Sequence, residues 1–276
     1  MLNKISYGLL ALSLIPSTIY AKTADEILKS SLSDEDKGKV IFTELDERDF
    51  GFGNYTVNVQ MTLKNSHGQE SVREMRNKTF EIEDTSQGDK TIIVFDKPRD
   101  LKGTAFLTFS RILEPDKQWM YLSEVGRVKR ILSKNKSGPF LGSEFAFEDI
   151  SSQEVEKYSY KYLKQDKCGE NMDMECFVVE RYPLYEYSGY TKHVTWVDTV
   201  EFRPIKTDFY DRKKELVKTL EYNGYQKYLD KYWRADEFNM INHQNGKSTN
   251  LQWQNYDFDA GLKENDFTKA KLKRVK

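Results

Sequence analysis

The chain has 276 residues, of which 38% are hydrophobic and 32% charged, and its formal net charge is −1 at pH 7. A chain so close to neutrality has no general electrostatic attraction for nucleic acid, so nucleic acid is not an expected partner. Its 17 tyrosines and 16 phenylalanines favour strands and can build a core from rings. Because no Pro/Gly/Ser-rich linker or internal repeat marks a boundary, we expect one domain over residues 22–276.

The first 21 residues have the pattern of a secretory signal peptide. Lys4 precedes an apolar run over residues 7–15, and small residues lead to a cleavage site after Ala21. The run is too short to cross a bilayer, which takes about 20 residues, and no second apolar segment predicts a span. A buried N-terminal helix is the alternative, but the basic start and the polar sequel disfavour it. We therefore expect export to the periplasm.

Residues 23–32 are predicted to form an amphipathic helix capped by Thr23, and the acidic stretch 33–36 is predicted to be a linker. Residues 54–63 then alternate strictly: apolar side chains at Tyr55, Val57, Val59 and Met61 are separated by polar ones. This pattern is typical of a strand with one buried face. Further short strands are predicted over residues 72–83 and 91–95.

A meander of three strands is expected over residues 101–113, 118–123 and 127–132, with the last strand near a rim of the sheet. In the first two strands both faces are at least partly apolar. Pro139 can occupy a first helical position, so residues 140–150 are predicted to form a short helix with Leu141, Phe145 and Ile150 on its apolar side.

Three runs in this region, PRDLKGTAFLTF, QWMYLSEVGRVKRI and GSEFAFEDI, resemble a family of exported bacterial proteins described as outer membrane lipoprotein-sorting proteins. That family is related in fold to the lipoprotein carrier LolA. The resemblance implies a mainly β protein: a large curled antiparallel sheet, an unclosed LolA/LolB-like half-barrel, with an N-terminal helix and a short helical lid. It also implies a periplasmic location and a lipid-like ligand.

Residues 155–165 and 177–185 are predicted strands that flank two cysteines. Cys168 and Cys176 enclose a polar turn in a chain expected to be exported, which predicts a disulfide across the strand ends. A metal or redox pair is the alternative, but no histidine lies nearby and the spacing is not Cys-x-x-Cys. Residues 224–240 fit a helix or strands, with strand favoured in the second half, and residues 267–275 are a candidate edge strand.

No catalytic or metal motif is evident. The three histidines, His67, His193 and His243, occur in separate segments without metal-ligand spacing. Ser143 lacks the Gly-x-Ser-x-Gly elbow of a serine hydrolase, and no phosphate loop or dinucleotide fingerprint is present. We expect no enzyme activity, no cofactor and no metal. A hydrolase whose site is assembled from distant residues, with Ser143 near His193, remains the alternative.

A basic strand and the acidic predicted helix form the clearest polar constellation. Arg127, Lys129 and Arg130 would face the carboxylates of residues 144–149, either to latch a lid or to meet an anionic headgroup. Ordinary surface ion pairs, worth at most about 1 kcal/mol each, are the alternative. The lid and latch candidates are Arg127, Arg130, Phe145, Glu148 and Asp149.

A large sheet with apolar residues on both faces needs cover on both sides, which two helices cannot supply unless the sheet curls. A curled sheet would enclose a cup suited to acyl chains, whose burial yields about 0.8 kcal/mol per methylene. The cavity candidates are Val57, Val59, Met61, Leu107, Phe109, Trp119 and Tyr121.

The resulting hypothesis is a periplasmic carrier that moves lipid or lipoprotein acyl chains towards the outer membrane, with an inner-membrane transporter as a further candidate partner. A sensor or accessory protein of the same fold, docking on an inner-membrane exporter, is the competing interpretation.

Overall fold

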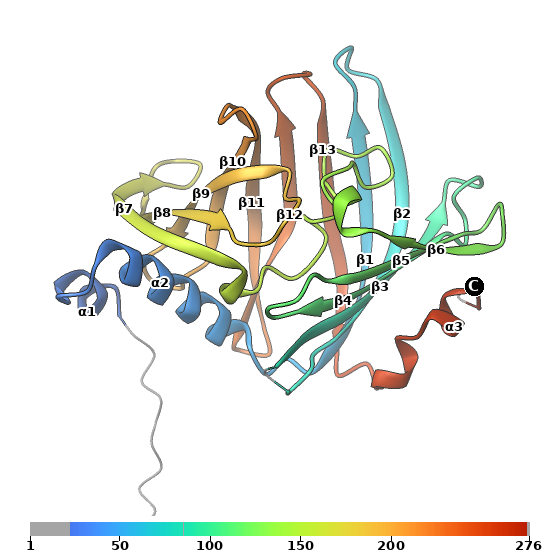
Figure 1. Cartoon of the computed structure of the whole chain (residues 1–276), viewed down its shortest axis with the longest axis horizontal. Coiled ribbons are helices and arrows are strands. Elements are labelled where there is room, and N and C mark those ends of the chain that lie inside the picture. Colours follow the sequence, from blue (N-terminus) through green and yellow to red (C-terminus); the bar gives the residue numbers. More distant parts are fainter. Residues whose placement is uncertain (1–22, 85, 275–276) are drawn as a thin grey trace, which may run out of the picture.

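The computed structural model describes residues 23–84 and 86–274 and contains one antiparallel sheet of 13 strands (Figure 1). The predicted signal peptide, residues 1–21, lies outside the described residues, as does Val275. The strands are β1 (Asn54–Lys64), β2 (Glu70–Phe80), β3 (Gln87–Lys97), β4 (Ala105–Arg111), β5 (Lys117–Leu122), β6 (Arg127–Ile131), β7 (Tyr158–Cys168), β8 (Met174–Pro183), β9 (Tyr190–Asp198), β10 (Pro204–Asp211), β11 (Leu216–Tyr228), β12 (Tyr232–Asn242) and β13 (Ser248–Phe258).

The strand order places the two edge strands at opposite ends of the sheet and so determines the path of the segment that joins them. It runs β6-β5-β4-β3-β2-β1-β13-β12-β11-β10-β9-β8-β7, so β1 pairs with β13 and the two edges are β6 and β7. These edge strands are consecutive in the chain but lie at opposite ends of the sheet. The segment that joins them must therefore cross a face of the sheet. The expected curled, unclosed antiparallel sheet and the edge position of residues 127–132 are confirmed.

The two faces of the sheet differ in burial, as strand β1 shows. Val57, Val59 and Met61 are buried on one face, and Asn58 and Gln60 between them are exposed on the other. We call the face that carries Val57, Val59 and Met61 the inner face, and the opposite one the outer face. Side chains from strands as far apart as β5 and β10 share one inner-face cluster, as the curl of the sheet requires.

From residue 23 onward, where the description of the chain begins, two helices precede the sheet. Helix α1 (Ala24–Lys29) begins with the expected cap, in which Thr23 and Glu26 form a reciprocal capping box. The predicted acidic linker is wrong, because residues 34–36 form the first turn of α2 (Asp34–Asp49). The Ser33 hydroxyl accepts a hydrogen bond from the Asp36 N–H at 3.1 Å, and the three acidic residues suit the positive end of the helix dipole.

Helix α2 packs closely on β7. Ile41 and Phe42 are buried there, together with Tyr160 and Phe177 of the sheet. Gly38 is required at this contact, because a Cβ on it would lie 2.9 Å from the Tyr160 Cβ. The inner face at this end of the sheet is therefore covered by a helix that sequence reasoning missed.

Residues 224–240 are strand throughout except for the turn between β11 and β12, which confirms the expectation for their second half. The candidate edge strand at residues 267–275 is wrong. The structure has instead a short helix, α3 (Lys269–Leu272), capped by the Thr268 side chain, which accepts from the Lys271 N–H at 3.2 Å. Phe267 and Leu272 are buried against the outer face, and this contact decides the conformation.

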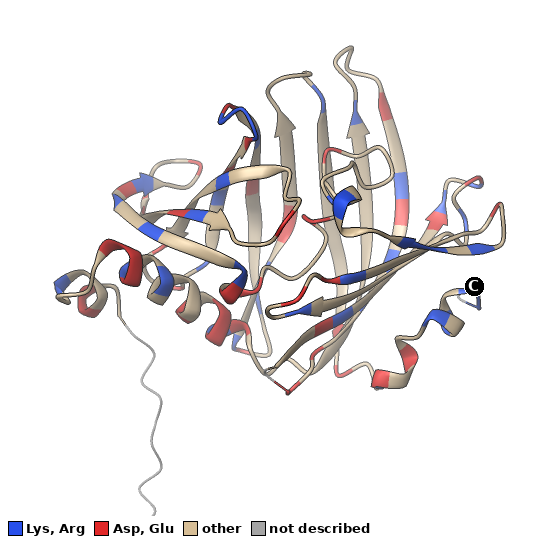
Figure 2. Ribbon diagram, viewed as in Figure 1, with Lys and Arg blue, Asp and Glu red and all other residues tan. Residues whose placement is uncertain are grey.

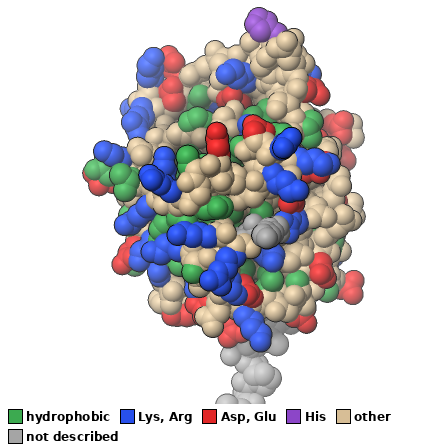
Figure 3. Space-filling model, turned by 90° about the vertical axis from the view of Figure 1, so that its right-hand side faces the viewer, with side chains coloured by type: hydrophobic (Ala, Val, Ile, Leu, Met, Phe, Trp, Pro, Cys, Tyr) green, Lys and Arg blue, Asp and Glu red, His purple; other side chains and the backbone are tan. Residues whose placement is uncertain are grey.

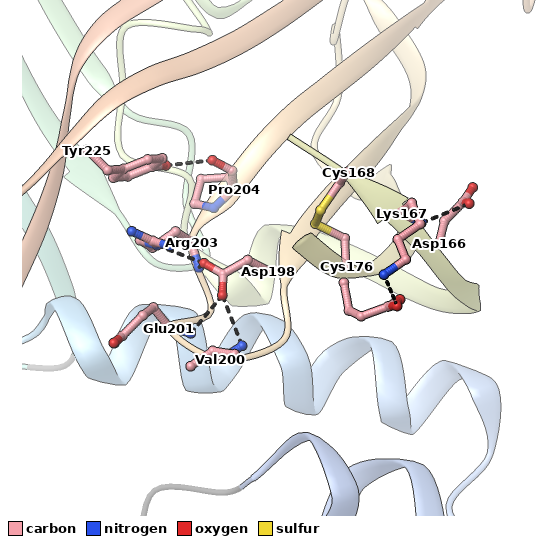
Figure 4. The surroundings of a disulfide bond; sticks show 11 residues. Asp166, Lys167, Cys168, Cys176, Asp198, Val200, Glu201, Arg203, Pro204 and Tyr225 are labelled. Carbon is pink, nitrogen blue, oxygen red and sulfur yellow. Dashed lines mark hydrogen bonds and ion pairs between the residues drawn. A yellow bond between two sulfur atoms is a disulfide. The ribbon is translucent and has the colours of Figure 1, made fainter. Parts of the chain in front are cut away.

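The predicted disulfide is present. Cys168 and Cys176 join the ends of β7 and β8, and Lys167 forms an ion pair with Glu175 beside the bond (Figure 4). The nearby turn after β9 is organised by Asp198, whose carboxylate accepts from the Val200 and Glu201 N–H groups. Among the described residues, no helix combines the length and the apolar character needed to cross a membrane.

Candidate functional site

The segment between the two edge strands forms a cover across the inner face. We call residues 133–154 the strap: it follows β6, which ends at Ile131, and precedes the short 3-10 helix Val155–Lys157 that leads into β7. It begins with another 3-10 turn, Ser133–Asn135, and is otherwise irregular. Beyond this turn and the polar residues after it, the strap falls into two halves that are held differently. We call residues 139–147, which carry its phenylalanine rings, the apolar half, and residues 148–154, which begin with two carboxylates, the polar half.

The apolar half fills the middle of the inner face. Phe140 is fully buried and Phe145 is 2% exposed, and both belong to the cluster that contains Val59 and Met61. The Phe140 ring centroid lies 5.2 Å from that of Phe106. The strap therefore occupies the surface that a hydrocarbon ligand would otherwise cover.

The predicted helix over residues 140–150 is wrong. Leu141 and Gly142 have positive φ angles of 48° and 80°, which end any helical turn. The chain instead folds back on itself, with the Phe140 N–H donating to the Phe145 carbonyl at 2.7 Å. The Ser143 hydroxyl donates to the Phe140 carbonyl at 2.8 Å and so serves this turn. Contacts with the sheet outweigh the weak local preference for a helix.

Polar side chains from the sheet reach the backbone of the apolar half. Arg73 donates to the Leu141 carbonyl at 2.6 Å, and the Lys218 ammonium donates to the Glu144 carbonyl at 2.7 Å. The Glu144 N–H donates to the Thr249 hydroxyl at 2.9 Å. These bonds satisfy backbone groups that would otherwise be buried without a partner.

The polar half is held by the carboxylate of Glu148. It accepts hydrogen bonds from the Tyr185 hydroxyl at 2.9 Å, the Ser188 hydroxyl at 2.9 Å and the Gly189 N–H at 2.8 Å. Burial raises the pKa of the Glu148 carboxyl, although the three donors oppose that change. Glu148 therefore fixes the strap to the connection between β8 and β9.

Asp149 holds the strap to the next strands. Its carboxylate accepts from the Tyr190 hydroxyl at 2.9 Å and from the Ala146 N–H at 2.6 Å, and the Lys218 ammonium lies 3.5 Å away. Lys218 also donates to the Tyr190 hydroxyl at 2.7 Å. Glu148, Asp149 and these partners thus hold the strap to the sheet, and we call this group of contacts the latch.

The partners of that latch differ from those predicted. Arg127 and Arg130 are exposed on the edge strand β6, and none of the ion pairs among the described residues joins either of them to the strap. Arg130 lies directly opposite Trp119 in the pairing of β5 with β6, which places it on the outer face. Phe145, the remaining lid candidate, lies in a turn of the strap and not in a helix.

The cavity candidates fall into two groups. Val57, Val59 and Met61 lie in the inner-face cluster beneath the strap. Leu107 and Trp119 belong to a separate outer-face cluster, against which Phe109 and Tyr121 also pack. The structure therefore does not bring the seven residues together on one surface.

Sequence reasoning missed the inner-face residues of β3–β5 and of the far half of the sheet. They are Phe95, Phe106, Met120, Phe209, Leu220 and Met240. No alternation distinguishes the two faces in β4, where Ala105, Phe106 and Leu107 are all buried. The pairing register would have separated them, but a single sequence does not determine it.

A buried row of polar and aromatic side chains crosses the inner face beside the latch. Arg181, His193 and Phe209 lie opposite one another on β8, β9 and β10. The His193 ring is packed between Tyr190 and Phe209, with ring centroids 5.0 and 4.7 Å away. Burial, together with the charges of Arg181 and Lys218, holds the pKa of His193 well below its usual value.

The structure does not pair His193 with Ser143. The Ser143 hydroxyl bonds to strap carbonyls, and neither ring nitrogen of His193 has a hydrogen-bond partner among the described side chains. In the described part of the chain, no group of three or more His, Cys, Asp or Glu residues is arranged to hold a metal ion.

Comparison with known proteins places this architecture in a family. A family model described as an uncharacterized protein matches residues 87–274. A solved outer membrane lipoprotein-sorting protein domain from Vibrio parahaemolyticus is 50% identical with a TM-score of 0.84, and the match covers 87% of this chain and all of that one. No protein with a curated description matches the chain significantly.

Two more distant structures share the fold. A DUF1329 family protein from Desulfovibrio piger ATCC 29098 is 25% identical with a TM-score of 0.81, over 87% of this chain and 100% of that chain. A LolA superfamily protein from Nitrosomonas europaea is 21% identical with a TM-score of 0.66, over 87% and 99%. The chain therefore belongs to the outer membrane lipoprotein-sorting protein family and has a LolA-like fold.

Proposed function

We propose that this protein is a periplasmic carrier that binds lipid or lipoprotein acyl chains on the inner face of its sheet, and that the strap covers this face until a chain displaces it. In this proposal the leader ends at Ala21 and residues 22–276 act as one domain. Transfer proceeds towards the outer membrane, with an inner-membrane transporter as the donor, and requires neither a cofactor nor covalent catalysis. Membership of a lipoprotein-sorting family supports this carrier role.

One observation carries the proposal: the strap is attached to the inner face by side chains. Its contacts with the sheet are the Phe140 and Phe145 rings and bonds from side chains such as Arg73 and Lys218. The one isolated β-bridge recorded among the described residues, Pro139 with Ala146, lies within the strap itself. The strap can therefore lift from the inner face while the pairing of all 13 strands stays intact.

The free energy gained by burying an acyl chain on the inner face is comparable to that gained by burying the phenylalanine rings of the strap there. Burying a phenylalanine side chain contributes about 1.5–3 kcal/mol, and burying a methylene about 0.8 kcal/mol. An acyl chain of roughly a dozen methylenes can therefore offset the loss of two buried rings and the hydrogen bonds of the latch. The uncovered surface would be lined by Val57, Val59 and Met61 together with the missed inner-face residues.

The test is to measure binding of a fluorescent fatty acid to the purified protein and to identify co-purifying lipid by mass spectrometry. We expect saturable binding that strengthens in Phe140→Ala, because this variant removes the most deeply buried part of the cover. Phe267→Ala is the matched control, since that ring is equally buried on the outer face. A folded Phe140→Ala protein that binds no fatty acid and carries no lipid would count against the carrier.

A further inference from the structure

An open pocket of about 610 Å³ lies on the outer face, between the edge of the sheet and the C-terminal helix. Strands β5 and β6 and helix α3 contribute its walls. We call it the basic pocket and define it by Trp119, Val128, Arg130, Lys269, Ala270, Lys273 and Arg274. Four of these seven side chains are cationic and none is acidic.

The cations of the basic pocket are exposed and uncompensated. Arg130, Lys269, Lys273 and Arg274 are all exposed, and none takes part in the ion pairs found among the described residues. The nearby Lys271, by contrast, is paired with Asp266. The Lys269 ammonium lies 5.1 Å from the centre of the Trp119 ring, so the floor of the pocket is an aromatic surface flanked by positive charge.

Charge is distributed unevenly over the whole molecule. The net charge is only −1, yet α2 carries seven acidic and three basic residues. Figure 2 shows this acidic helix at one side and the basic edge strand β6 and helix α3 at the other. Figure 3 views the second side, where many lysine and arginine side chains surround apolar surface. Such a distribution orients the protein in the field of an anionic surface.

We propose that the basic pocket and the adjoining edge strand β6 form a docking surface for an anionic phospholipid membrane. Exposed cations match lipid phosphates, and Arg130 is the residue of β6 that carries positive charge on this face, because it lies opposite Trp119 in the pairing with β5. Trp119 is only 8% exposed, so its ring backs the pocket from within the sheet, whereas Val125, 55% exposed in the turn before β6, is an apolar side chain open to the lipid. The acidic helix α2 would then face away from the membrane.

This placement also concerns the strap. The strap begins directly after β6, so docking would bring its first turn, Ser133–Asn135, next to the membrane surface. A carrier that meets its donor or acceptor membrane in this way would have one end of its cover beside the lipid. The docking proposal itself does not depend on acyl-chain binding, because it concerns the opposite face of the sheet.

Co-sedimentation with vesicles tests the proposal. The purified protein is mixed with vesicles of phosphatidylcholine alone, and with vesicles in which a third of the lipid is phosphatidylglycerol, at low and at high salt. We expect binding to the anionic vesicles only, weakened by salt. Each cation near the surface contributes about a fivefold gain in affinity, so the triple variant Arg130→Gln, Lys269→Gln, Lys273→Gln should bind on the order of 100-fold more weakly.

A matched variant controls for net charge. Lys161→Gln, Lys213→Gln, Lys247→Gln also removes three positive charges, at exposed lysines remote from the pocket that take part in none of the recorded ion pairs. We expect this protein to bind anionic vesicles as the parent protein does. Equal weakening of the two triple variants would overturn the site, because it would show a response to net charge alone.

Two further outcomes would also overturn the proposal. One is the absence of binding to either vesicle. The other is binding of inorganic phosphate that the pocket variant abolishes, without any vesicle binding, which would indicate a small-anion site. Fatty-acid binding is measured separately on the same proteins. Loss of vesicle binding with fatty-acid binding retained separates failure of docking from failure of the carrier.

Discussion

Strands β3–β5 are apolar on both faces, and the covers of the two faces differ. On the inner face Phe95, Phe106 and Met120 lie under the strap. On the outer face Leu107 and Trp119 lie with the C-terminal residues Phe267 and Leu272.

The inner cover combines buried rings with a polar latch, whereas the outer cover consists of a few apolar side chains beside a basic pocket. A two-sided apolar strand must be covered twice, but only one of these covers spans the sheet from edge to edge. In the carrier that we propose, the inner face is therefore the one that exchanges its cover for a ligand.

Removing one ring from each cover should have the largest effect. Phe140→Ala and Phe267→Ala each remove a ring that is at most 1% exposed, so each should lower the free energy of unfolding by about 3–5 kcal/mol. Urea denaturation measures this. Only Phe140→Ala should also raise the affinity for a fluorescent fatty acid. An equal gain in both variants would mean that the two faces do not differ in ligand binding.

Opening the disulfide should destabilise the protein without changing either cover. Cys168 and Cys176 are eight positions apart, and closing so short a loop contributes roughly 2–3 kcal/mol. The double variant Cys168→Ser, Cys176→Ser should lose that much stability to urea and should keep the fatty-acid affinity of the parent. A change in affinity would show that the β7–β8 hairpin communicates with the strap.

The latch should have a smaller effect that is confined to the strap. Tyr185→Phe removes a donor to the buried Glu148 carboxylate and should cost about 1–2 kcal/mol. Hydrogen exchange should then be faster over residues 133–154. Tyr182→Phe is the matched control, because Tyr182 donates to Glu180 on β8, away from the strap. Faster strap exchange in the control as well would contradict a specific latch.

Acidification should lower the free energy of unfolding through the buried His193 on the inner face. Its pKa is lowered in the folded protein, so below the ordinary value of about 6.5 the unfolded chain takes up a proton that the folded chain does not. The stability that His193 contributes is therefore present above that pH and is lost as the pH falls. One unit below, at about pH 5.5, the loss should be roughly 1.4 kcal/mol.

The comparison with His193→Leu isolates this contribution. Burial raises the pKa of Glu154 to about 7 and also raises that of Glu148, and these carboxyls act with the opposite sign. They are common to both proteins, so they cancel in the difference between the two unfolding free energies. That difference should be constant above about pH 6.5 and should change below it. A constant difference down to pH 5 would exclude His193 as the cause.

Local sequence determined several structural elements of this protein: a strand, a helix cap and the disulfide. The alternation in residues 54–63, the Thr23 cap and the cysteine pair all appear in the structure as expected, because each depends on residues close together in the chain. Helix α2 was missed because its buried face, which includes Gly38, Ile41, Phe42 and Glu44, is not a continuous apolar stripe. Its position depends on β7, which lies more than a hundred residues further along the chain.

Only the tertiary structure decided the candidate site. Sequence indicated that strands β4 and β5 are apolar, but the face on which Leu107 and Phe106 lie depends on register, since a shift by one residue exchanges the two faces. The conformation of the strap does not follow from its local sequence. The turn at Leu141 and Gly142 forms because side chains of the strap have partners on the sheet, as Phe140, Glu148 and Asp149 do. Those partners come from strands remote in sequence, and only the folding of the whole sheet brings them together.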